Sequence, residues 1–460
     1  MISAAEIARA CDGIVVGAAD AVVTSWAFDS RALEPGACFV ALRGERDGHE
    51  FVADAFAAGA RVALIADAVP GVEPPVGAAM VRVDNVLDRL QDLARADRAA
   101  RVALRVVGVT GSTGKTSTKD LLAAALEPLG CYASPASYNN EFGLPITLLN
   151  APAATRVVVA EMGERFPGDI AALCAIARPD IGVVTNVGLA HAEHLGGPRG
   201  AAKAMGELVE SLPEGGLAVF NADDEWTATL APGGGVSVVT VGTAAAADYR
   251  VEQIELDEQL RPSFLLRGRR VTVPLHGEHQ VLNAALALAV AHRGFDIDLD
   301  TAAAALASVR PARWRLELET SASGITVLND AYNANPTSME AALRALASAP
   351  VAGRRIAVLG DMRELGVYSD EAHKVVGRRT AELGIDVVIG GGAGGRAIAD
   401  AAGTELPRMA PVHEVHTARD VGEALRIVRE VTVPGDTVLV KASRAVGLEA
   451  VAADLLGAAS

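Results

Sequence analysis

The stretch from Val106 to Asp120, VVGVTGSTGKTSTKD, limits what this chain can fold into more than any other. An apolar run from Val102 to Val109 predicts a buried strand, a turn rich in Gly, Ser and Thr follows, and TSTKDLLAAAL predicts a helix. These are the parts of a phosphate-binding loop, in which backbone N–H groups and the positive end of the helix dipole converge on phosphate oxygens. The stretch therefore predicts a nucleotide-binding α/β domain.

The residue types in this loop indicate individual roles. Lys115 is placed to reach the terminal phosphates, and the Thr116 hydroxyl is placed to hold Mg²⁺. The expected ATP cradle also includes Gly111, Ser112, Thr113, Gly114 and Ser117. The common pattern has a glycine five positions before Gly114, where this chain has Val109, so a Gly-rich turn with an incidental lysine is the alternative.

The length of 460 residues favours about three domains, which we expect at 1–101, 102–312 and 313–460. Strand and helix patterns alternate throughout. The predicted fold class is α/β, with a smaller N-terminal α/β domain, a central P-loop-type and mostly parallel sheet, and a C-terminal Rossmann-like α/β domain. Residues 231 to 247, rich in Gly and Ala, are expected to form a flexible connection, and the alternating pattern after them predicts antiparallel strands.

Charge and composition exclude several classes of protein. A net charge of −16 argues against a nucleic-acid partner, because a basic surface is the usual footprint there. The four cysteines form no C-x-x-C pair, which is typical of a reducing compartment. The N-terminal stretch does not resemble a signal peptide, and no apolar run reaches the length of a membrane span. We therefore expect a cytoplasmic protein without membrane insertion.

Polar side chains follow several of the predicted strands. Glu161 and His191 end strands of the central domain, so they are expected at the sheet edge that carries Lys115, where they are reasonable Mg²⁺ ligands. A helix cap or a salt bridge is the ordinary alternative for such a Glu. In the N-terminal domain, Ser30 and Arg31 lie where a ligand binds or where an Arg simply forms a surface salt bridge.

Two further polar groups follow later in the chain. A predicted helix begins at GEHQVLNAAL, and the side-chain amide of Asn283 in its first turn is placed to recognise an adenine edge or to cap the helix. Asp330, Asn333 and Asn335 crowd a loop, and Pro336 begins the helix after it. In contrast, Gly390-x-Gly392-x-x-Gly395 matches a dinucleotide fingerprint without a first βαβ unit around it, so a tight strand-to-helix turn is favoured.

Taken together, these motifs resemble the Mur ligases over nearly the whole chain. The similarity lies in GVTGSTGKTSTKD, SYNNEFGLPITLL, EMGERFPGDI, NVGLAHAEHLG, GEHQVLNAAL, NDAYNANPTSMEAAL, VLGDMRELG and VLVKASRAVGLE. DAYNANPTSMEAA and VLGDMRELG look most like the members that add a dipeptide. The resemblance implies ATP-dependent amide bond formation, in which a carboxylate becomes an acyl phosphate that an amine then attacks.

The resemblance also implies partners and residue roles. The substrates would be UDP-MurNAc-tripeptide and D-Ala-D-Ala, with ATP and two Mg²⁺ ions as cofactors. The protein itself is expected to be a monomer. Lys115 would stabilise the γ-phosphate, Thr116 and Glu161 would hold one Mg²⁺, and His191 would hold the second. The remaining implied contacts are Asn283 with adenine, Asp330 with ribose, Arg313 with the phosphates after domain closure, Ser30 and Arg31 with the UDP end, and Asn333 and Asn335 on the dipeptide side.

Two positions depart from the family pattern. Several members have a lysine, modified to a carbamate, fourteen residues after the motif histidine, where this chain has Met205. Lys203 is two positions away, which turns its direction on a helix by about 200°. Gln280 also replaces the more usual asparagine after His279. A related ligase adding a different amino acid, and a P-loop kinase or nucleotide switch, are the alternative functions.

The role of Lys115 gives a direct prediction. Lys115→Ala is expected to abolish ATP turnover and to leave the fold intact, because the substitution removes the cation that meets the terminal phosphates. Phosphate release and circular dichroism measure the two parts. Turnover within a few-fold of the unsubstituted chain would contradict the assigned role.

Overall fold

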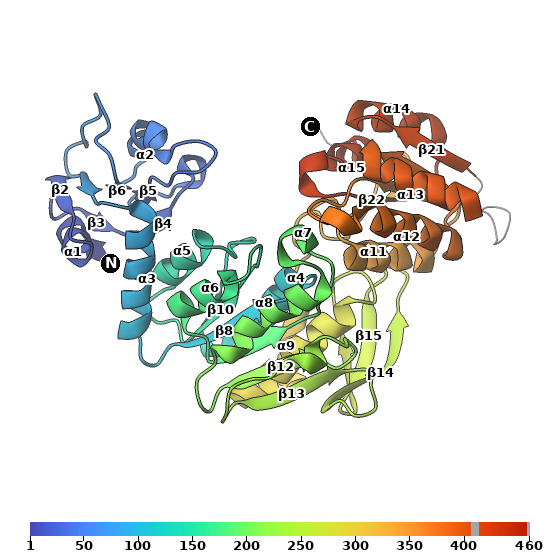
Figure 1. Cartoon of the computed structure of the whole chain (residues 1–460), viewed down its shortest axis with the longest axis horizontal. Helices are drawn as coiled ribbons and strands as arrows, with labels where there is room; N and C mark the ends of the chain where they lie inside the picture. The colour runs from blue at the N-terminus through green and yellow to red at the C-terminus, as the bar shows by residue number, and fades with distance from the viewer. Residues whose placement is uncertain (406–413, 458–460) are drawn as a thin grey trace. The chain divides into compact units, whose positions relative to one another are not determined.

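The computed structural model describes residues 1–405 and 414–457. The chain forms two compact units, and each is described here by itself. The first contains Met1–Gly108, Leu129–Met162 and Ala171–Asp180, and the second contains Val109–Pro128, Gly163–Ile170 and the chain from Ile181 onward. Figure 1 shows the elements of both units in chain order from blue to red.

The N-terminal part of the first unit is a five-stranded sheet in the order β2-β7-β6-β5-β4. Its strands are β2 (Ile14–Gly17), β4 (Trp26–Ala27), β5 (Cys38–Val40), β6 (Val62–Ile65) and β7 (Ala79–Arg82), all parallel except β2. A two-stranded sheet of β1 (Ile2–Ser3) and β3 (Val22–Val23) accompanies it, with the helices α1 (Ala4–Ala10), α2 (Val52–Ala57) and α3 (Val86–Ala100).

The side chains of these strands alternate between two separate cores. Cys38 and Val40 pack in one cluster with α1 and α3, whereas Phe39 packs in another with α2. This alternation follows from the period-2 geometry of a strand, and it explains why the runs CFV and VALI are apolar throughout.

The rest of the first unit contains β9 (Cys131–Ala133), α5 (Gly143–Asn150), β10 (Val157–Glu161) and most of α6 (Asp169–Ala177), with β9 and β10 parallel. Strand β8 (Arg105–Thr110) begins in this unit, where the Arg105 N–H donates to the Arg156 carbonyl at 2.9 Å. It ends in the second unit, where the Thr110 carbonyl accepts from the Thr185 N–H at 3.0 Å.

In the second unit, β11 to β16 form a sheet in chain order. The strands are β11 (Ile181–Val184), β12 (Leu217–Asn221), β13 (Ser237–Gly242), β14 (Tyr249–Leu256), β15 (Pro262–Leu266) and β16 (Arg269–Thr272). Strands β11 to β14 pair in parallel. Strand β15 pairs antiparallel with both β14 and β16, as the alternating sequence predicted. The helices here are α4 (Lys115–Ala125), α7 (Ala192–Leu195), α8 (Pro198–Glu210), α9 (Gln280–Phe295) and α10 (Leu299–Ala305).

The prediction of a flexible connection over residues 231 to 247 was wrong. Strand β13 lies inside that range and pairs with β12 from Leu217↔Ser237 to Asn221↔Val241. The surrounding Gly and Ala residues obscured SVVTVG, whose β-branched side chains favour a strand.

The C-terminal sheet has the order β17-β18-β22-β19-β20-β21. Its strands are β17 (Glu317–Thr320), β18 (Thr326–Asn329), β19 (Arg355–Leu359), β20 (Val387–Gly391), β21 (Glu414–Ala418) and β22 (Thr437–Lys441), with only β17 antiparallel among them. Helices α11 (Pro336–Ser348), α12 (Ser369–Glu382) and α13 (Gly392–Glu405) pack on one face, and α14 (Val421–Val431) and α15 (Glu449–Leu456) on the other (Figure 1).

These sheets confirm the predicted α/β class with a mostly parallel central sheet, while the boundaries at 101 and 312 stay predictions. Within residues 1–405 and 414–457, none of the helices is both long and apolar enough to cross a membrane.

At the Gly390–Gly395 turn, the Asp361 carboxylate accepts from the Gly394 N–H at 2.7 Å. The chain's own carboxylate thus meets the start of α13, in line with a tight structural turn.

A buried ion pair in the C-terminal sheet predicts an acid-sensitive contribution to stability. The Asp436 side chain is fully buried and accepts from the Arg354 N–H at 2.9 Å and from Arg354 Nη2 at 2.8 Å. Burial raises the pKa of Asp436, but the hydrogen bonds from the Arg354 side chain, the Arg354 backbone and Val433 outweigh it and hold that pKa below its usual value.

A depressed folded-state pKa stabilises the fold above the unfolded-state value of about 4, and this contribution disappears as pH falls through the folded value. Asp436→Asn is expected to lower the free energy of unfolding at pH 7 by about 2 kcal/mol, because a buried hydrogen-bonded charge is lost. The difference between the two chains should shrink below about pH 4. Urea unfolding measured from pH 7 to pH 3 tests this, and a constant difference would contradict it.

Candidate functional site

The phosphate-binding loop turns from β8 into α4 through two glycines whose backbone other residues cannot adopt. Gly111 has φ +139°, and a Cβ there would lie 2.0 Å from Thr185 Oγ1. Gly114 has φ +83°, and a Cβ there would lie 2.5 Å from Asn283 Oδ1. Positive φ and close approach both require glycine at these positions. The loop geometry therefore depends on Gly111 and Gly114, and Val109 is simply a buried residue of β8.

Thr185 and Asn186, which follow β11, hold this loop in place. The Ser112 N–H donates to the Asn186 carbonyl at 3.0 Å, and the Thr113 N–H donates to Asn186 Oδ1 at 3.0 Å. The Thr113 carbonyl in turn accepts from Asn186 Nδ2 at 3.0 Å and from Thr185 Oγ1 at 2.5 Å. Sequence analysis did not identify this clamp, although a Thr-Asn pair at a parallel strand end was a signal that could have indicated it.

A second contact to the loop comes from Asn335, at the start of helix α11. Asn335 is the N-cap of α11, where its Oδ1 accepts from the Ser338 N–H at 2.9 Å. Its Nδ2 donates to the Ser112 carbonyl at 3.2 Å, and the Ser112 hydroxyl accepts from the Gly188 N–H at 2.7 Å. Asn335 thus links α11 to the loop, and its contact with a dipeptide stays a prediction.

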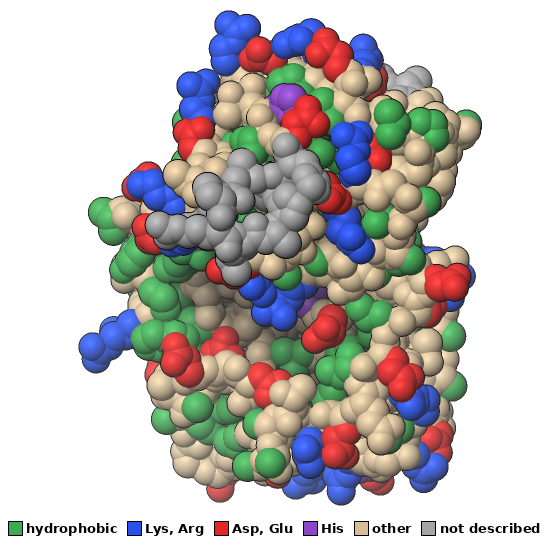
Figure 2. Space-filling model, turned by 90° about the vertical axis from the view of Figure 1, so that its right-hand side faces the viewer, with side chains coloured by type: hydrophobic (Ala, Val, Ile, Leu, Met, Phe, Trp, Pro, Cys, Tyr) green, Lys and Arg blue, Asp and Glu red, His purple; other side chains and the backbone are tan. Residues whose placement is uncertain are grey.

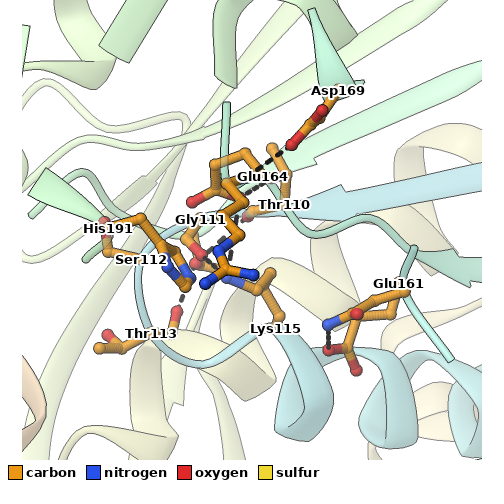
Figure 3. Close-up of polar contacts among 12 residues, drawn as sticks. Thr110, Gly111, Ser112, Thr113, Lys115, Glu161, Glu164, Asp169 and His191 are labelled. Carbon is orange, nitrogen blue, oxygen red and sulfur yellow. Dashed lines mark hydrogen bonds and ion pairs between the residues drawn. The ribbon is translucent and has the colours of Figure 1, made fainter. Parts of the chain in front are cut away.

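Lys115, the first residue of α4, lies among carbonyl and carboxylate oxygens. Its ammonium group donates to the Gly111 carbonyl and lies 3.8 Å from Glu164 Oε2. Glu164 also accepts from Thr110 Oγ1 at 3.2 Å. Figure 3 shows Glu164 beside Thr110 and the loop, with Asp169 lying farther from the loop. Sequence analysis missed Glu164 and considered only the neighbouring Glu161.

The first turn of α4 packs against the start of α9. Thr116 is buried, and Ser117 is half-buried beside it. One turn into the helix, Thr118 Oγ1 donates to Asn283 Oδ1 at 3.3 Å, and Asn283 Nδ2 donates to Gln280 Oε1 at 2.9 Å. Asn283 thus joins the two helices directly below Gly114, and its proposed contact with adenine stays a prediction.

His279, next to these amides, is half-buried, and its pKa lies well below neutrality. Desolvation of the ring is the main cause that lowers the pKa of His279 to about 4, while the negative charge of Asp330 opposes this shift and the positive charge of Lys441 adds to it. Its Nε2 lies 3.1 Å from Gln280 Nε2, whereas Nδ1 makes no hydrogen bond to any residue that the structure describes. A neutral imidazole can accept a hydrogen bond from the side-chain amide of Gln280.

His191 lies at the start of α7 with φ +51°, and its ring is fixed by Glu364. Nδ1 of His191 contacts the Glu364 carboxylate, which also accepts from Arg165 Nη2 at 2.8 Å. The Glu364 carbonyl accepts from the Glu193 N–H at 3.0 Å. Burial raises the pKa of Glu364, but His191 and Arg165 outweigh it and lower that pKa overall. A carboxylate that holds one ring nitrogen is also found at histidines that bind a metal through the other, and the role of His191 as a Mg²⁺ ligand stays a prediction.

Glu161, in the first unit, is the last residue of β10 and is buried. Its Oε1 accepts from Asn139 Nδ2 at 2.9 Å, and its N–H donates to Ser134 Oγ at 3.3 Å. A carboxylate oriented by an amide suits a Mg²⁺ ligand, since Mg²⁺ is usually bound by one or two carboxylates together with phosphates.

Among the described residues, no three His, Cys, Asp or Glu side chains gather into a metal-binding group. Mg²⁺ that accompanies a nucleotide is held largely by phosphates, and Thr116, Glu161 and His191 as its protein ligands stay predictions. Met205 of α8 is fully buried among apolar residues, while Lys203 is exposed. The two positions thus point in different directions, as the helical geometry predicted.

The loop after β18 is held by a buried lysine. Lys441 is 2% exposed, and its Nζ donates to Asp330 Oδ2 at 2.5 Å and to the Asn333 carbonyl at 2.8 Å. Asp330 Oδ1 accepts from the Leu316 N–H at 3.1 Å. Asp330 and Asn333 are therefore brought together by Lys441, which sequence analysis did not assign. The contact of Asp330 with ribose stays a prediction.

Arg313 is exposed, with its guanidinium 4.5 Å from the centre of the Trp314 ring, and Arg444 lies 4.1 Å from the same ring. Figure 2 shows one face of the molecule, on which Lys and Arg side chains and Asp and Glu side chains are interspersed. The role of Arg313 in binding phosphates stays a prediction.

Ser30 and Arg31 lie in the short 3-10 helix η1 (Ser30–Ala32) of the first unit. Arg31 donates to Asp29 through Nε at 2.9 Å and Nη2 at 2.7 Å, and its side chain is 88% exposed. Hydrogen bonds from the Arg31 side chain and backbone lower the pKa of Asp29, although partial burial of the carboxylate acts to raise it. The salt-bridge alternative is therefore present, and binding of a UDP end by Ser30 and Arg31 stays a prediction.

Three family models match successive parts of the chain: "Mur ligase family, catalytic domain" at residues 23–98, "Mur ligase middle domain" at 109–291, and "Mur ligase, glutamate ligase domain" at 314–444. The UDP-N-acetylmuramoyl-tripeptide–D-alanyl-D-alanine ligase of Mycobacterium bovis is 41% identical over an alignment of 462 positions, which covers 92% of this chain and 90% of that protein.

Solved structures match as well. A crystal structure of MurF from Acinetobacter baumannii is 28% identical, with a TM-score of 0.84, and covers 99% of this chain and 98% of that one. The MurF ligase of Thermotoga maritima in complex with ADP is 28% identical, with a TM-score of 0.76, and covers 95% and 98% of the two chains.

The clamp on the loop gives a prediction for nucleotide binding. Asn186→Ala removes the side-chain hydrogen bonds to the Thr113 N–H and carbonyl, so the loop loses its fixed shape. We expect the affinity for ADP to fall about tenfold, which corresponds to a loss of about 1.4 kcal/mol in binding free energy. Isothermal titration calorimetry measures the affinity.

Asn85→Ala is the matched control, because it removes an Asn oxygen that accepts two backbone N–H groups at the start of α3. That substitution is expected to cost stability of the order of 1 kcal/mol without changing ADP affinity. Equal ADP affinities in Asn186→Ala and the unsubstituted chain would show that the clamp does not organise the loop.

Proposed function

The chain belongs to the Mur ligase family, and we propose that it joins D-Ala-D-Ala to UDP-MurNAc-tripeptide in peptidoglycan precursor synthesis, with conversion of ATP to ADP and phosphate. The observation that carries this proposal is the 41% identity to a ligase of that name over 92% of the chain. The ADP complex of the Thermotoga maritima relative supports ATP as the nucleotide.

The reaction needs an activated carboxyl group, because a carboxylate is a poor electrophile. The terminal carboxylate of the tripeptide attacks the γ-phosphorus of ATP, the bond to the bridging oxygen breaks, and ADP leaves. The amine of D-Ala-D-Ala then attacks the acyl carbon, the C–O bond to phosphate breaks, and the amine loses a proton as the amide forms. Positioning and neutralisation of charge supply most of the catalysis in such transfers.

The loop residues suit the first step. Backbone N–H groups at the start of α4 bind phosphate oxygens, and Lys115 exchanges the Gly111 carbonyl for the terminal phosphate. Thr116, Glu161 and His191 would hold Mg²⁺, which neutralises phosphate charge when bound. Asn335 connects the loop to α11, so the loop and the sheet that carries Lys441 and Asp330 are linked by a hydrogen bond.

The finer assignments belong to the same proposal. We expect Arg313 to meet the phosphates, Asp330 the ribose, Asn283 the adenine, and Ser30 with Arg31 the UDP end, in a cytoplasmic monomer. NDAYNANPTSMEAAL favours a dipeptide-adding ligase over a member that adds a single amino acid. A P-loop kinase or switch is disfavoured because the matches to Mur ligases extend over all three parts of the chain.

Phosphate release tests this function. We expect release from ATP only when UDP-MurNAc-tripeptide and D-Ala-D-Ala are both present, with the pentapeptide product appearing in equal amount by mass spectrometry. The control replaces D-Ala-D-Ala with diaminopimelate or lysine. Release with UDP-MurNAc-dipeptide and one of those amino acids, or release without an acceptor, would contradict the proposal.

A further inference from the structure

Glu164 has a carboxylate oxygen that the residues around it do not satisfy. Its side chain is 0% exposed, and Oε2 accepts from Thr110 Oγ1 and lies 3.8 Å from Lys115 Nζ. Oε1 is buried and makes no hydrogen bond to any residue that the structure describes. A buried carboxylate oxygen without a donor is costly, so its place beside the phosphate-binding loop calls for a ligand.

Lys115 only partly compensates this charge. A separation of 3.8 Å is too long for a hydrogen bond, and the lysine already donates to the Gly111 carbonyl. The guanidinium of the neighbouring Arg165 donates to Glu364 at 2.8 Å, and no ion pair joins it to Glu164 among the described residues. A buried carboxylate thus lies beside the loop, and the cation that it pairs with is the lysine that phosphate binding must remove.

Nucleotide binding makes this imbalance larger. When Lys115 turns to a phosphate, Glu164 loses its partner, and further negative charge arrives beside it. Two like charges in a buried site disfavour one another, unless a cation lies between them. A divalent cation with oxygen ligands satisfies both the phosphates and Glu164 Oε1.

We propose that Glu164 has two partners in turn: in the nucleotide-free chain it is the counter-ion of Lys115, and in the nucleotide-bound chain its Oε1 is a ligand of the divalent cation that accompanies ATP. This proposal rests on the proposed use of ATP, but not on the identity of the acceptor or the amine. It adds Glu164 to the residues predicted to hold Mg²⁺ and accounts for a carboxylate buried against a loop that binds anions.

The test measures the binding of Mn²⁺, a paramagnetic probe for the Mg²⁺ site, to the full chain. Free Mn²⁺ is followed by electron paramagnetic resonance with ADP present in excess. Glu164→Gln keeps the shape and removes the charge, and we expect it to weaken Mn²⁺ binding about tenfold or more. ADP binding in the presence of EDTA should be unchanged or tighter in the same variant, because Lys115 is no longer attracted by Glu164.

Asp169→Asn is the matched control. Asp169 belongs to the same segment, but its carboxylate accepts from the Arg165 and Phe166 N–H groups. We expect this variant to bind Mn²⁺ within about twofold of the unsubstituted chain, which separates a ligand from a general effect of charge. Glu164→Asp, with its shorter side chain, should give an intermediate affinity and serves as the test if the Gln variant does not fold.

The outcomes separate the alternatives. Mn²⁺ affinity unchanged in Glu164→Gln, or in Glu164→Asp where that variant is used, would overturn the proposal. Equal losses of Mn²⁺ binding and of metal-free ADP binding would also overturn it, because they would indicate that Glu164 only supports the loop. Both measurements omit the peptide substrates, so a failure of the proposed ligase reaction leaves this result interpretable.

Discussion

The approach of the phosphate-binding loop to the end of β11 is the contact on which the site depends. At Gly111 the backbone lies so near Thr185 that a single methyl group would collide with its hydroxyl. This closeness lets Asn186 bond the backbone of Ser112 and Thr113 from both its main chain and its side chain. A loop fixed in this way presents the N–H groups at the start of α4 to phosphate without an entropic cost of ordering at the moment of binding.

Charge burial around this loop follows a common principle. Lys115 and Glu164, Lys441 and Asp330, and His191 and Glu364 each place a cationic or ionisable group against a carboxylate. In low-dielectric surroundings such pairs are favourable only while each partner is compensated. Lys441 and Asp330 are further satisfied by Asn333 and Leu316, whereas Glu164 retains an unsatisfied oxygen. This difference makes Glu164 the member of these pairs that still has an oxygen available to a ligand.

The sequence allowed prediction of features that depend on local pattern. Strand, glycine turn and helix around Lys115, the α/β class, and the antiparallel strands after Tyr249 all follow from periodicity and turn chemistry. Strand β13 escaped because composition over a broad window hid a short β-branched run. Asn186, Glu164 and Glu364 act through neighbours 54 to 173 positions away in the chain, and only the fold brings such partners together. The roles of Arg313, Ser30 and Arg31 depend on ligands and stay predictions.

The central claim is that Lys115 and Glu164 exchange partners when nucleotide and cation bind. A crystal structure of the full chain with ADP and Mn²⁺, using the anomalous signal of manganese, tests it most directly. The account predicts that Lys115 Nζ leaves the Gly111 carbonyl for a phosphate oxygen and that Glu164 Oε1 coordinates the cation directly. Lys115 still bound to Gly111, or a cation whose ligands do not include Glu164, would contradict it.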